Sequence, residues 1–368
     1  MSSRVDSNAH AFVCPPSVQS NYMSILCNGE LTITPEIEKR IAGASHVIGV
    51  DGGMNHCDKM HMIPHWVVGD FDSIDPELLK KFENEDLQRL HRAKDYTDLE
   101  VAIENAKRIN ACAQIIIFGG LGGRIDHTLT NVLILLRDPA RLFLETDSQV
   151  LFGLNECLGR TKIQADHYKT LALIPFHGKV TNIEVESDEG ITKYEVLKDE
   201  ILLLPHKSHY WIHVGGGDLI VVLDKREITP LSNLPKGYLK PDFSAQQSFI
   251  HVANYFLHQS KNFQNVILET PAEKVENIQA SSGKKTFSVQ RGQTISLIPF
   301  NGPAKQIKTQ GLKWELGEEV QQLDKSFIGI SNVCLGNEFS IELEEGEILC
   351  VINSLIDESM IEIEKTKI

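Results

Sequence analysis

The chain has 368 residues, of which 42% are hydrophobic and 23% are charged, a composition typical of a soluble globular protein with room for two or three cores. Its 50 acidic and 36 basic residues give a formal net charge of −14, which argues against binding to nucleic acid or to an anionic membrane surface. The seven cysteines are scattered without a CxxC pair, so they predict neither a disulfide framework nor a zinc knuckle and favour a cytoplasmic protein.

The first 21 residues are polar and lack the basic and apolar regions of a secretory signal. No uninterrupted apolar run of about 18 residues occurs in the sequence, so no membrane span is predicted. We therefore expect residues 1–21 to form a flexible tail.

Residues 22–144 alternate short apolar segments with amphipathic ones. The pattern predicts strands at residues 23–28, 46–53, 65–73 and 114–120, and helices at residues 35–44, 95–110 and 126–136. Thr97 is placed to cap the second of these helices. This alternation predicts a doubly wound, mainly parallel α/β sheet, which binds its ligands beyond the carboxyl ends of the strands.

After residue 144 the sequence changes to short strands with Gly, Asn and Asp turns, which is typical of antiparallel β structure. This part contains a repeat: TLALIPFHG begins at residue 170 and TISLIPFNG at residue 294, while LFLET begins at residue 142 and VILET at residue 266. Both matches are separated by 124 residues, which indicates a tandem duplication. The predicted parts are a first, degenerate β-sandwich-like domain at 145–228, a linker and helix at 229–265, a second such domain at 266–357 and a tail at 358–368.

An acidic loop follows the predicted strand at 65–73. Asp70 and Asp72 lie two residues apart, so both carboxylates can face one cation, and Mg²⁺ is typically held in this way together with phosphate oxygens. Asp98 begins the next helix, with Asp95 just before it. Each motif alone is also explained structurally, as an acidic turn or as helix capping. Together, at one edge of an α/β sheet, they predict a metal site.

The segment GGLGGRIDHT, residues 119–128, places two glycine pairs and an arginine between a strand and a helix. Glycines allow close approach of phosphates, a helix start offers N–H donors, and Arg124 adds a fixed positive charge. The segment matches neither GxGxxG nor GxxxxGK[ST], so it does not predict a classical dinucleotide or P-loop site. Combined with the carboxylates, it predicts Mg²⁺-nucleotide chemistry of the phosphoryl-transfer type.

The second β copy contains a candidate acceptor site. Trp314 lies in the turn-rich segment TQGLKWELG, and FIGISN ends in Ser331 and Asn332. An aromatic face suits a flat or cationic ring, although Trp314 as an ordinary core residue fits the sequence equally well.

In this order, the motifs DGGMNH, GDFDSI, KDYTDLEVAI, GGLGGRIDHTLTN, SLIPF, TQGLKWEL and ISN resemble the thiamin pyrophosphokinase (thiamin diphosphokinase) family. The resemblance covers residues 23–144 and residues 292–352. It implies an α/β domain that binds ATP and Mg²⁺, a β domain that helps to bind thiamin, and a homodimer that builds each site from both subunits.

The resemblance also implies roles for individual residues. The catalytic and metal-binding carboxylates would be Asp70, Asp72 and Asp98. The ATP and phosphate site would comprise Asn28, Asp51, Gly52, Gly119, Gly120, Gly122, Gly123, Arg124, Asp126 and His127. The thiamin site would comprise Trp314, Ser331 and Asn332.

The sequence departs from the family because residues 145–291, with an additional β copy, precede the motif-bearing copy. We expect the first copy to be structural or dimerising. Two alternatives to a thiamin pyrophosphokinase stay open: a pyrophosphokinase for another heterocyclic alcohol, such as a hydroxymethylpterin, and a non-catalytic sensor of thiamin or nucleotide.

Overall fold

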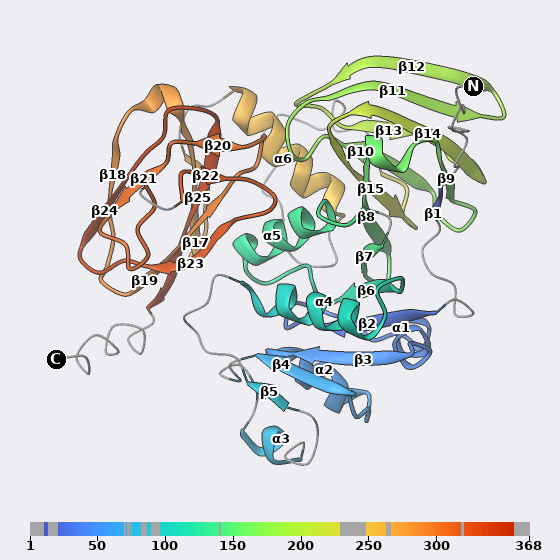
Figure 1. Cartoon of the computed structure of the whole chain (residues 1–368), viewed down its shortest axis with the longest axis horizontal. Coiled ribbons are helices and arrows are strands. Elements are labelled where there is room, and N and C mark those ends of the chain that lie inside the picture. Colours follow the sequence, from blue (N-terminus) through green and yellow to red (C-terminus); the bar gives the residue numbers. More distant parts are fainter. Residues whose placement is uncertain are drawn as a thin grey trace, which may run out of the picture.

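The computed structural model describes residues 11–13, 21–69, 71, 74, 76–81, 87–89, 96–139, 141–228, 248–262, 266–317 and 320–356 (Figure 1). A sheet of ten strands runs through the first half of the molecule in the order β13-β10-β15-β8-β7-β6-β2-β3-β4-β5. Its parallel part comprises β2 (Tyr22–Leu26), β3 (His46–Val50), β4 (Trp66–Gly69), β5 (Leu87–Arg89), β6 (Gln114–Phe118) and β7 (Leu142–Glu145). The strands predicted in this part are confirmed.

Helices cover both faces of the parallel strands, as their apolar character on both faces requires. They are α1 (Pro35–Ala42), the short η1 (Asp51–Gly53) and α2 (Met54–Lys59), α3 (Pro76–Lys81), α4 (Asp98–Ile109) and α5 (Ile125–Leu135). Thr97 caps α4 as predicted, and Glu100 completes a capping box by accepting the Thr97 backbone N–H. Most of α5 is buried, because it packs against both the sheet and the second β domain.

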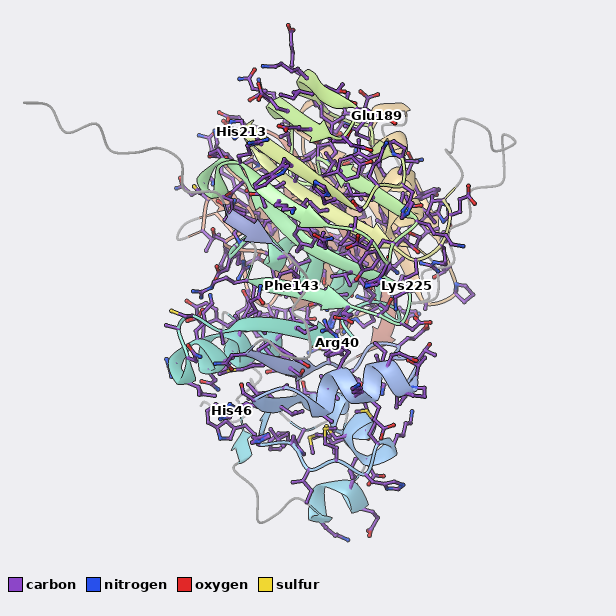
Figure 2. All side chains as sticks on the ribbon, turned by 90° about the vertical axis from the view of Figure 1, so that its right-hand side faces the viewer. Arg40, His46, Phe143, Glu189, His213 and Lys225 are labelled. Atoms are coloured by element: carbon purple, nitrogen blue, oxygen red, sulfur yellow. The ribbon has the colours of Figure 1, made fainter. Side chains whose placement is uncertain are left out.

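The first β domain continues the α/β sheet. Its strands β8 (Gln149–Asn155), β10 (Thr170–Ile174), β13 (Leu202–Leu204) and β15 (Asp218–Asp224) extend the sheet beyond β7 in antiparallel pairing. Phe143 of β7, labelled in Figure 2, belongs to the core of this domain. Its ring packs on Phe152, with ring centroids 5.6 Å apart. The boundary predicted between residues 144 and 145 therefore falls inside one continuous sheet.

A second sheet, in the order β1-β9-β14-β11-β12, covers these antiparallel strands. It comprises β1 (Ala11–Val13), β9 (Thr161–Gln164), β11 (Val180–Ser187), β12 (Gly190–Leu197) and β14 (His209–Gly216). β1 lies within the segment predicted to be a flexible tail, and it instead pairs in parallel with β9 through backbone hydrogen bonds.

The helix α6 (Phe249–Asn262) lies between the two β domains (Figure 1). The second β domain has a five-stranded sheet in the order β16-β17-β25-β19-β23 and smaller sheets in the orders β18-β24-β21 and β20-β22. Its strands are β16 (Val266–Glu269), β17 (Glu273–Gln279), β18 (Lys285–Ser288), β19 (Gln293–Ile298), β20 (Ala304–Lys305), β21 (Lys308–Gln310), β22 (Gln322–Leu323), β23 (Gly329–Val333), β24 (Glu338–Glu342) and β25 (Glu347–Ile356). The fold class predicted from the sequence, α/β followed by β, is confirmed.

The duplication is visible strand by strand. β7, β8 and β9 each begin and end 124 residues before β16, β17 and β18. The strand order β13-β10-β15-β8-β7 of the first copy recurs as β23-β19-β25-β17-β16 in the second. The two copies therefore share one topology, although their sequences have diverged.

Parts of the predicted organisation lie outside the described residues, namely residues 229–247 of the linker and residues 358–368 of the tail. The division of the chain into domains otherwise stays a prediction. No helix of the described residues is long and apolar enough to cross a membrane.

We expect Gly53→Ala to lower the free energy of unfolding by at least roughly 2 kcal/mol, as overpacking does. An added Cβ would lie 1.9 Å from the backbone oxygen of Leu26, at the end of β2. Urea unfolding measures the change. Gly336→Ala is the control, because its added Cβ would lie 4.0 Å from its nearest neighbour, and we expect a change within about 0.5 kcal/mol. Equal effects in the two variants would contradict the prediction.

Candidate active site

The loops that follow β2 and β6 lie side by side at the carboxyl ends of these neighbouring strands. The Gly29 N–H donates to the Gly119 carbonyl at 2.8 Å, and the Glu30 N–H donates to the Leu121 carbonyl at 3.1 Å. A Cβ at Gly29 would lie 2.4 Å from the Gly119 oxygen, so this close pairing requires glycine. The loop of Asn28 is thereby fixed against the Gly-rich segment.

Asp51 holds the loop that follows β4. Its Oδ1 accepts a hydrogen bond from the Phe71 N–H at 3.1 Å, and a Cβ at Gly69 would lie 1.7 Å from the same oxygen. Asp51 and Phe71 both have positive φ angles, 43° and 67°, which are rare for residues with a side chain. Backbone strain of this kind clusters at functional sites. Asp70 and Asp72, which flank Phe71, lie outside the described residues.

Asp98 reaches the same sheet edge from the first turn of α4. Burial, together with the charges of Asp51 and Asp98, raises the pKa of the Cys27 thiol to about 12. Both carboxylates therefore lie close enough to the end of β2 to act on one thiol. Within the described residues, no group of three or more His, Cys, Asp or Glu side chains is arranged to hold a metal ion.

The Gly-rich segment turns sharply into α5. Gly119, Gly122 and Gly123 have φ angles of 64°, 80° and 75°, which favour glycine, and a Cβ at Gly123 would meet no described heavy atom within 4 Å. Gly120 packs against Leu144. The first turn of α5 thus has an open approach, with His127 exposed beside it.

Arg124 precedes α5 and connects it to the second β domain. Its guanidinium forms two hydrogen bonds to the Asp126 carboxylate, at 3.0 and 2.6 Å, and its Nη2 donates to Ser331 Oγ at 3.2 Å. The Arg124 side chain is 31% exposed, so part of the guanidinium is accessible to a ligand. Arg124, which is predicted to bind phosphate, and Ser331, which belongs to the predicted acceptor site, are therefore in direct contact.

Asp126 is fully buried and makes several contacts. Besides Arg124, its carboxylate accepts hydrogen bonds from Ser296 Oγ at 2.6 Å, from Asn353 Nδ2 at 3.2 Å and from the His127 N–H at 2.9 Å. Burial by itself would raise the pKa of Asp126, but His127, Arg124 and Ser296 together hold it well below its usual range. The structure thus places Asp126 among protein groups, where it orients Arg124.

Glu273 of β17 receives the N-terminus of α5. Its carboxylate accepts the Ile125 N–H at 3.0 and 3.2 Å. Burial and the charge of Asp126 raise the pKa of Glu273 to about 7. A second titratable carboxyl group thus lies at the junction between α5 and the second β domain.

Asn332 fixes the backbone of Trp314. Its Oδ1 accepts the Trp314 N–H at 3.1 Å, and its Nδ2 donates to the Trp314 carbonyl at 2.7 Å. Trp314 is 38% exposed, with Lys313 Nζ 5.1 Å from its ring centroid. Ser331 has a φ of 55°, and its N–H donates to Ser296 Oγ at 2.9 Å. Trp314, Asn332, Ser331 and Arg124 therefore form a continuous series of neighbours.

A cavity of about 310 Å³ lies beside this series, between α4, α5 and the second β domain. Its walls combine aromatic, apolar and polar groups, including an ion pair between Arg137 and Glu100. The lining residues are Tyr96, Thr97, Glu100, Thr130, Arg137, Val320, Ser326, Phe327, Ile328 and Ile330.

The structure brings most predicted site residues to one region. The carboxyl edge of the sheet carries Asn28, Asp51, Gly52, Asp98 and the Gly-rich segment that ends in Arg124. Arg124 contacts Ser331, and Asn332, which follows Ser331 in the chain, contacts Trp314. The sequence analysis missed Glu273, Ser296 and Asn353. Two of them differ in chemistry from their counterparts in the first copy, 124 residues earlier: Ser296 corresponds to Ala172, and Glu273 to Gln149. This difference between the copies is a signal that the sequence contains.

Two family models match the chain. "Thiamin pyrophosphokinase, catalytic domain" matches residues 37–144, and "Thiamin pyrophosphokinase, vitamin B1 binding domain" matches residues 283–364, together just over half of the chain. The chain belongs to the thiamin pyrophosphokinase family. The vitamin B1 binding model matches the second β copy, the one that contacts Arg124.

Individual thiamin pyrophosphokinases are similar over a shorter length. Thiamin pyrophosphokinase 1 of Caenorhabditis elegans is 32% identical over 123 residues, which cover 31% of this chain and 49% of that protein. Thiamine pyrophosphokinase of Bacillus subtilis is 32% identical over 118 residues, which cover 31% of this chain and 54% of that protein. The chain thus spans about half the length of these curated relatives. A crystal structure of thiamin pyrophosphokinase from Geobacillus thermodenitrificans aligns with a TM-score of 0.48 and 23% identity, over 56% of this chain and 98% of that one.

We expect Glu273→Gln to remove a pH dependence of stability. The pKa of this carboxyl rises from 4.5 to about 7 on folding, so the folded state binds more protons between these pH values. The free energy of unfolding of the wild type should therefore fall as the pH rises from about 4.5 to about 7, by roughly 3 kcal/mol. Glutamine keeps an oxygen acceptor for the Ile125 N–H but does not titrate.

Urea unfolding of both proteins between pH 5 and pH 8 measures the effect. The two stabilities should be similar at pH 5, and the variant should be the more stable protein at pH 8. Parallel pH profiles would contradict the assignment.

Proposed function

We propose that this protein transfers the pyrophosphoryl group of ATP to the hydroxyl of thiamin, giving thiamin diphosphate and AMP. The observation that carries the proposal is the hydrogen bond between Arg124 Nη2 and Ser331 Oγ. It joins two parts of the site. The Gly-rich segment with Arg124 suits a polyphosphate, and the residues Ser331, Asn332 and Trp314 present an exposed aromatic face that suits a flat cationic ring.

The proposed step is an in-line displacement. The hydroxyl oxygen of thiamin forms a bond to the β-phosphorus of ATP, and the bond from that phosphorus to the oxygen shared with the α-phosphorus breaks, so that AMP leaves with the electron pair. The hydroxyl proton passes to a carboxylate, for which Asp72 and Asp98 are the candidates. Arg124 and the backbone N–H groups around Gly122 and Gly123 would neutralise charge on the phosphates, since such reactions depend on positioning and electrostatics.

Asp70, Asp72 and Asp98 are the proposed ligands of Mg²⁺. The contacts of Asp51 with Phe71 and Gly69 support this assignment, because they fix these two residues, which flank Asp70 in the sequence, near the sheet edge that Asp98 reaches. When bound, Mg²⁺ would supply positive charge that offsets the negative charge of the phosphates. The ATP site would further include Asn28, Gly52, Gly119, Gly120 and His127, with Asp126 orienting Arg124 from behind.

The resemblance also implies a cytoplasmic homodimer, and this stays a prediction. The two alternatives, pyrophosphoryl transfer to a hydroxymethylpterin and a non-catalytic sensor, are separated by assay. Purified protein with ATP, Mg²⁺ and thiamin should release AMP and thiamin diphosphate, and a chelator should abolish the release. AMP release with a pterin alcohol but not with thiamin would contradict the proposal, and binding without AMP release would favour the sensor.

We expect Trp314→Ala to raise the KM for thiamin by roughly five- to thirtyfold, since loss of an aromatic–cation contact costs about 1–2 kcal/mol. Tyr194→Ala is the matched control: Tyr194 occupies the comparable segment of the first copy. Steady-state kinetics at saturating ATP measures both variants. A thiamin KM that is raised by Tyr194→Ala and unchanged by Trp314→Ala would show that the acceptor site lies in the first copy, and would contradict the prediction.

A further inference from the structure

Equivalent residues of the two β copies contact each other. Phe176 and Phe300 are 124 residues apart and occupy the same place in the LIPF repeat, and their rings pack edge to face with centroids 5.0 Å apart. Gly178 and Gly302 are also 124 residues apart, and a Cβ built on Gly178 would lie 3.5 Å from the Cα of Gly302. Contacts between a residue and its own equivalent arise at a two-fold axis, so the copies meet as two subunits of a symmetric dimer do.

Contacts away from this axis are exchanged reciprocally. The Ile125 N–H, at the start of α5, donates to the Glu273 carboxylate. The Phe249 N–H, at the start of α6, donates to Gln149 Oε1 at 2.9 Å. Residues 125 and 249, like residues 149 and 273, are 124 apart. Each helix N-terminus is thus bound by the β copy of the other repeat, as in an isologous interface.

The repeated unit therefore begins with a helix. α5 precedes β7 as α6 precedes β16, and both helices begin at equivalent positions. α5 contacts β19 of the second copy, while α6 contacts the counterpart strand, β10, of the first. Phe249 of α6 also packs on Phe176, with ring centroids 5.4 Å apart.

The described residues of the second unit include no α/β part. The outer edge of β7 pairs with β6 and leads into the parallel strands, whereas β16 is an edge strand among the described residues. Only residues 225–248 separate the end of β15 from α6, but the α/β part upstream of α5 occupies residues 22–124. Among the described residues, the loops that are predicted to bind nucleotide therefore lie beside α5 and not beside α6.

The two junctions have opposite chemistry. At the junction of α5 with the second copy, Arg124, Asp126 and Ser296 form a polar network. The equivalent residues at the junction of α6 with the first copy are Ser248, Ile250 and Ala172, all of them buried. One junction thus holds the charged side chains of Arg124 and Asp126 beside the candidate site, and the equivalent positions of its counterpart, Ser248 and Ile250, are uncharged.

We propose that this chain is a fused dimer in which the second β domain acts as an internal partner subunit and completes a single site in cis, in place of the site shared between two chains that the resemblance implies. The part of the proposal that concerns the site rests on the proposed function, whereas the part that concerns the internal dimer does not. The first β domain has no α/β part opposite it, which accounts for its lack of the GLKW and SN residues.

A disulfide across the internal axis tests the arrangement without any assay of activity. The variant is Gly178→Cys/Gly302→Cys with Cys14, Cys112 and Cys157 replaced by Ser. Cβ atoms built at residues 178 and 302 lie 3.5 and 4.0 Å from the opposite Cα, which brings the two side chains within reach of a disulfide. We expect oxidation to give a cross-link within one chain, seen as a faster monomer band on a non-reducing gel. A covalent dimer, or no disulfide in the folded protein, would overturn the proposal. The single-cysteine variants are controls.

Mixing of two variants tests whether the site is completed within one chain. This experiment decides on the proposal if the positive φ angles at Gly178 and Gly302 prevent the cysteine variant from folding. Arg124→Ala and Trp314→Ala, carrying different tags, are co-expressed and purified through both tags and through each tag alone. We expect no pyrophosphokinase activity beyond that of the two parents. In a site shared between chains, each mixed dimer would have one intact site of two, so the protein purified through both tags would show about half of wild-type activity, and this result would overturn the proposal.

An inactive wild-type protein would contradict the proposed function alone, and the cross-link would still report on the internal dimer.

Discussion

The buried carboxylate of Asp126 is the interaction on which the arrangement of the two halves depends. An ionised group without water is costly unless charge and hydrogen bonds compensate it, and here the compensation comes from Arg124, Ser296 and Asn353. Two of these partners belong to the second β domain, so the domain must be docked for the charge to be satisfied. The same contacts orient Arg124 toward Ser331 and hence toward Trp314. The same contacts therefore determine both the stability of this junction and the geometry of the site.

The two helices α5 and α6 show how a duplicated interface can diverge. Both are received by the opposite β copy through an oxygen acceptor, Glu273 in one case and Gln149 in the other. The apolar contacts near the axis, including Phe176 and Phe300, hold the copies together at both junctions. The network of Arg124, Asp126 and Ser296 occurs at α5 only. At α6 the equivalents of Asp126 and Ser296 are the apolar residues Ile250 and Ala172.

The sequence predicted the parallel strands β2, β3, β4 and β6, the helices α1, α4, α5 and α6, the capping role of Thr97 and the duplication, because each has a local pattern of period, cap or repeat. It did not predict that β8 continues the α/β sheet, since strand pairing between distant segments leaves no local signal. Nor did it separate Asp126, which is buried among protein groups, from the other acids assigned to the nucleotide. That distinction depends on Ser296 and Asn353, which lie far away in the chain and meet Asp126 only after folding.

The covalent connection between the two repeats has a consequence for how the site is populated. Ser331 and Trp314 are tethered to Arg124 by one polypeptide, so the local concentration of the acceptor half is fixed by chain geometry and does not depend on how much protein the cell makes. Assembly of the site is then a first-order folding event. Dilution, which dissociates subunits, would leave such a site intact.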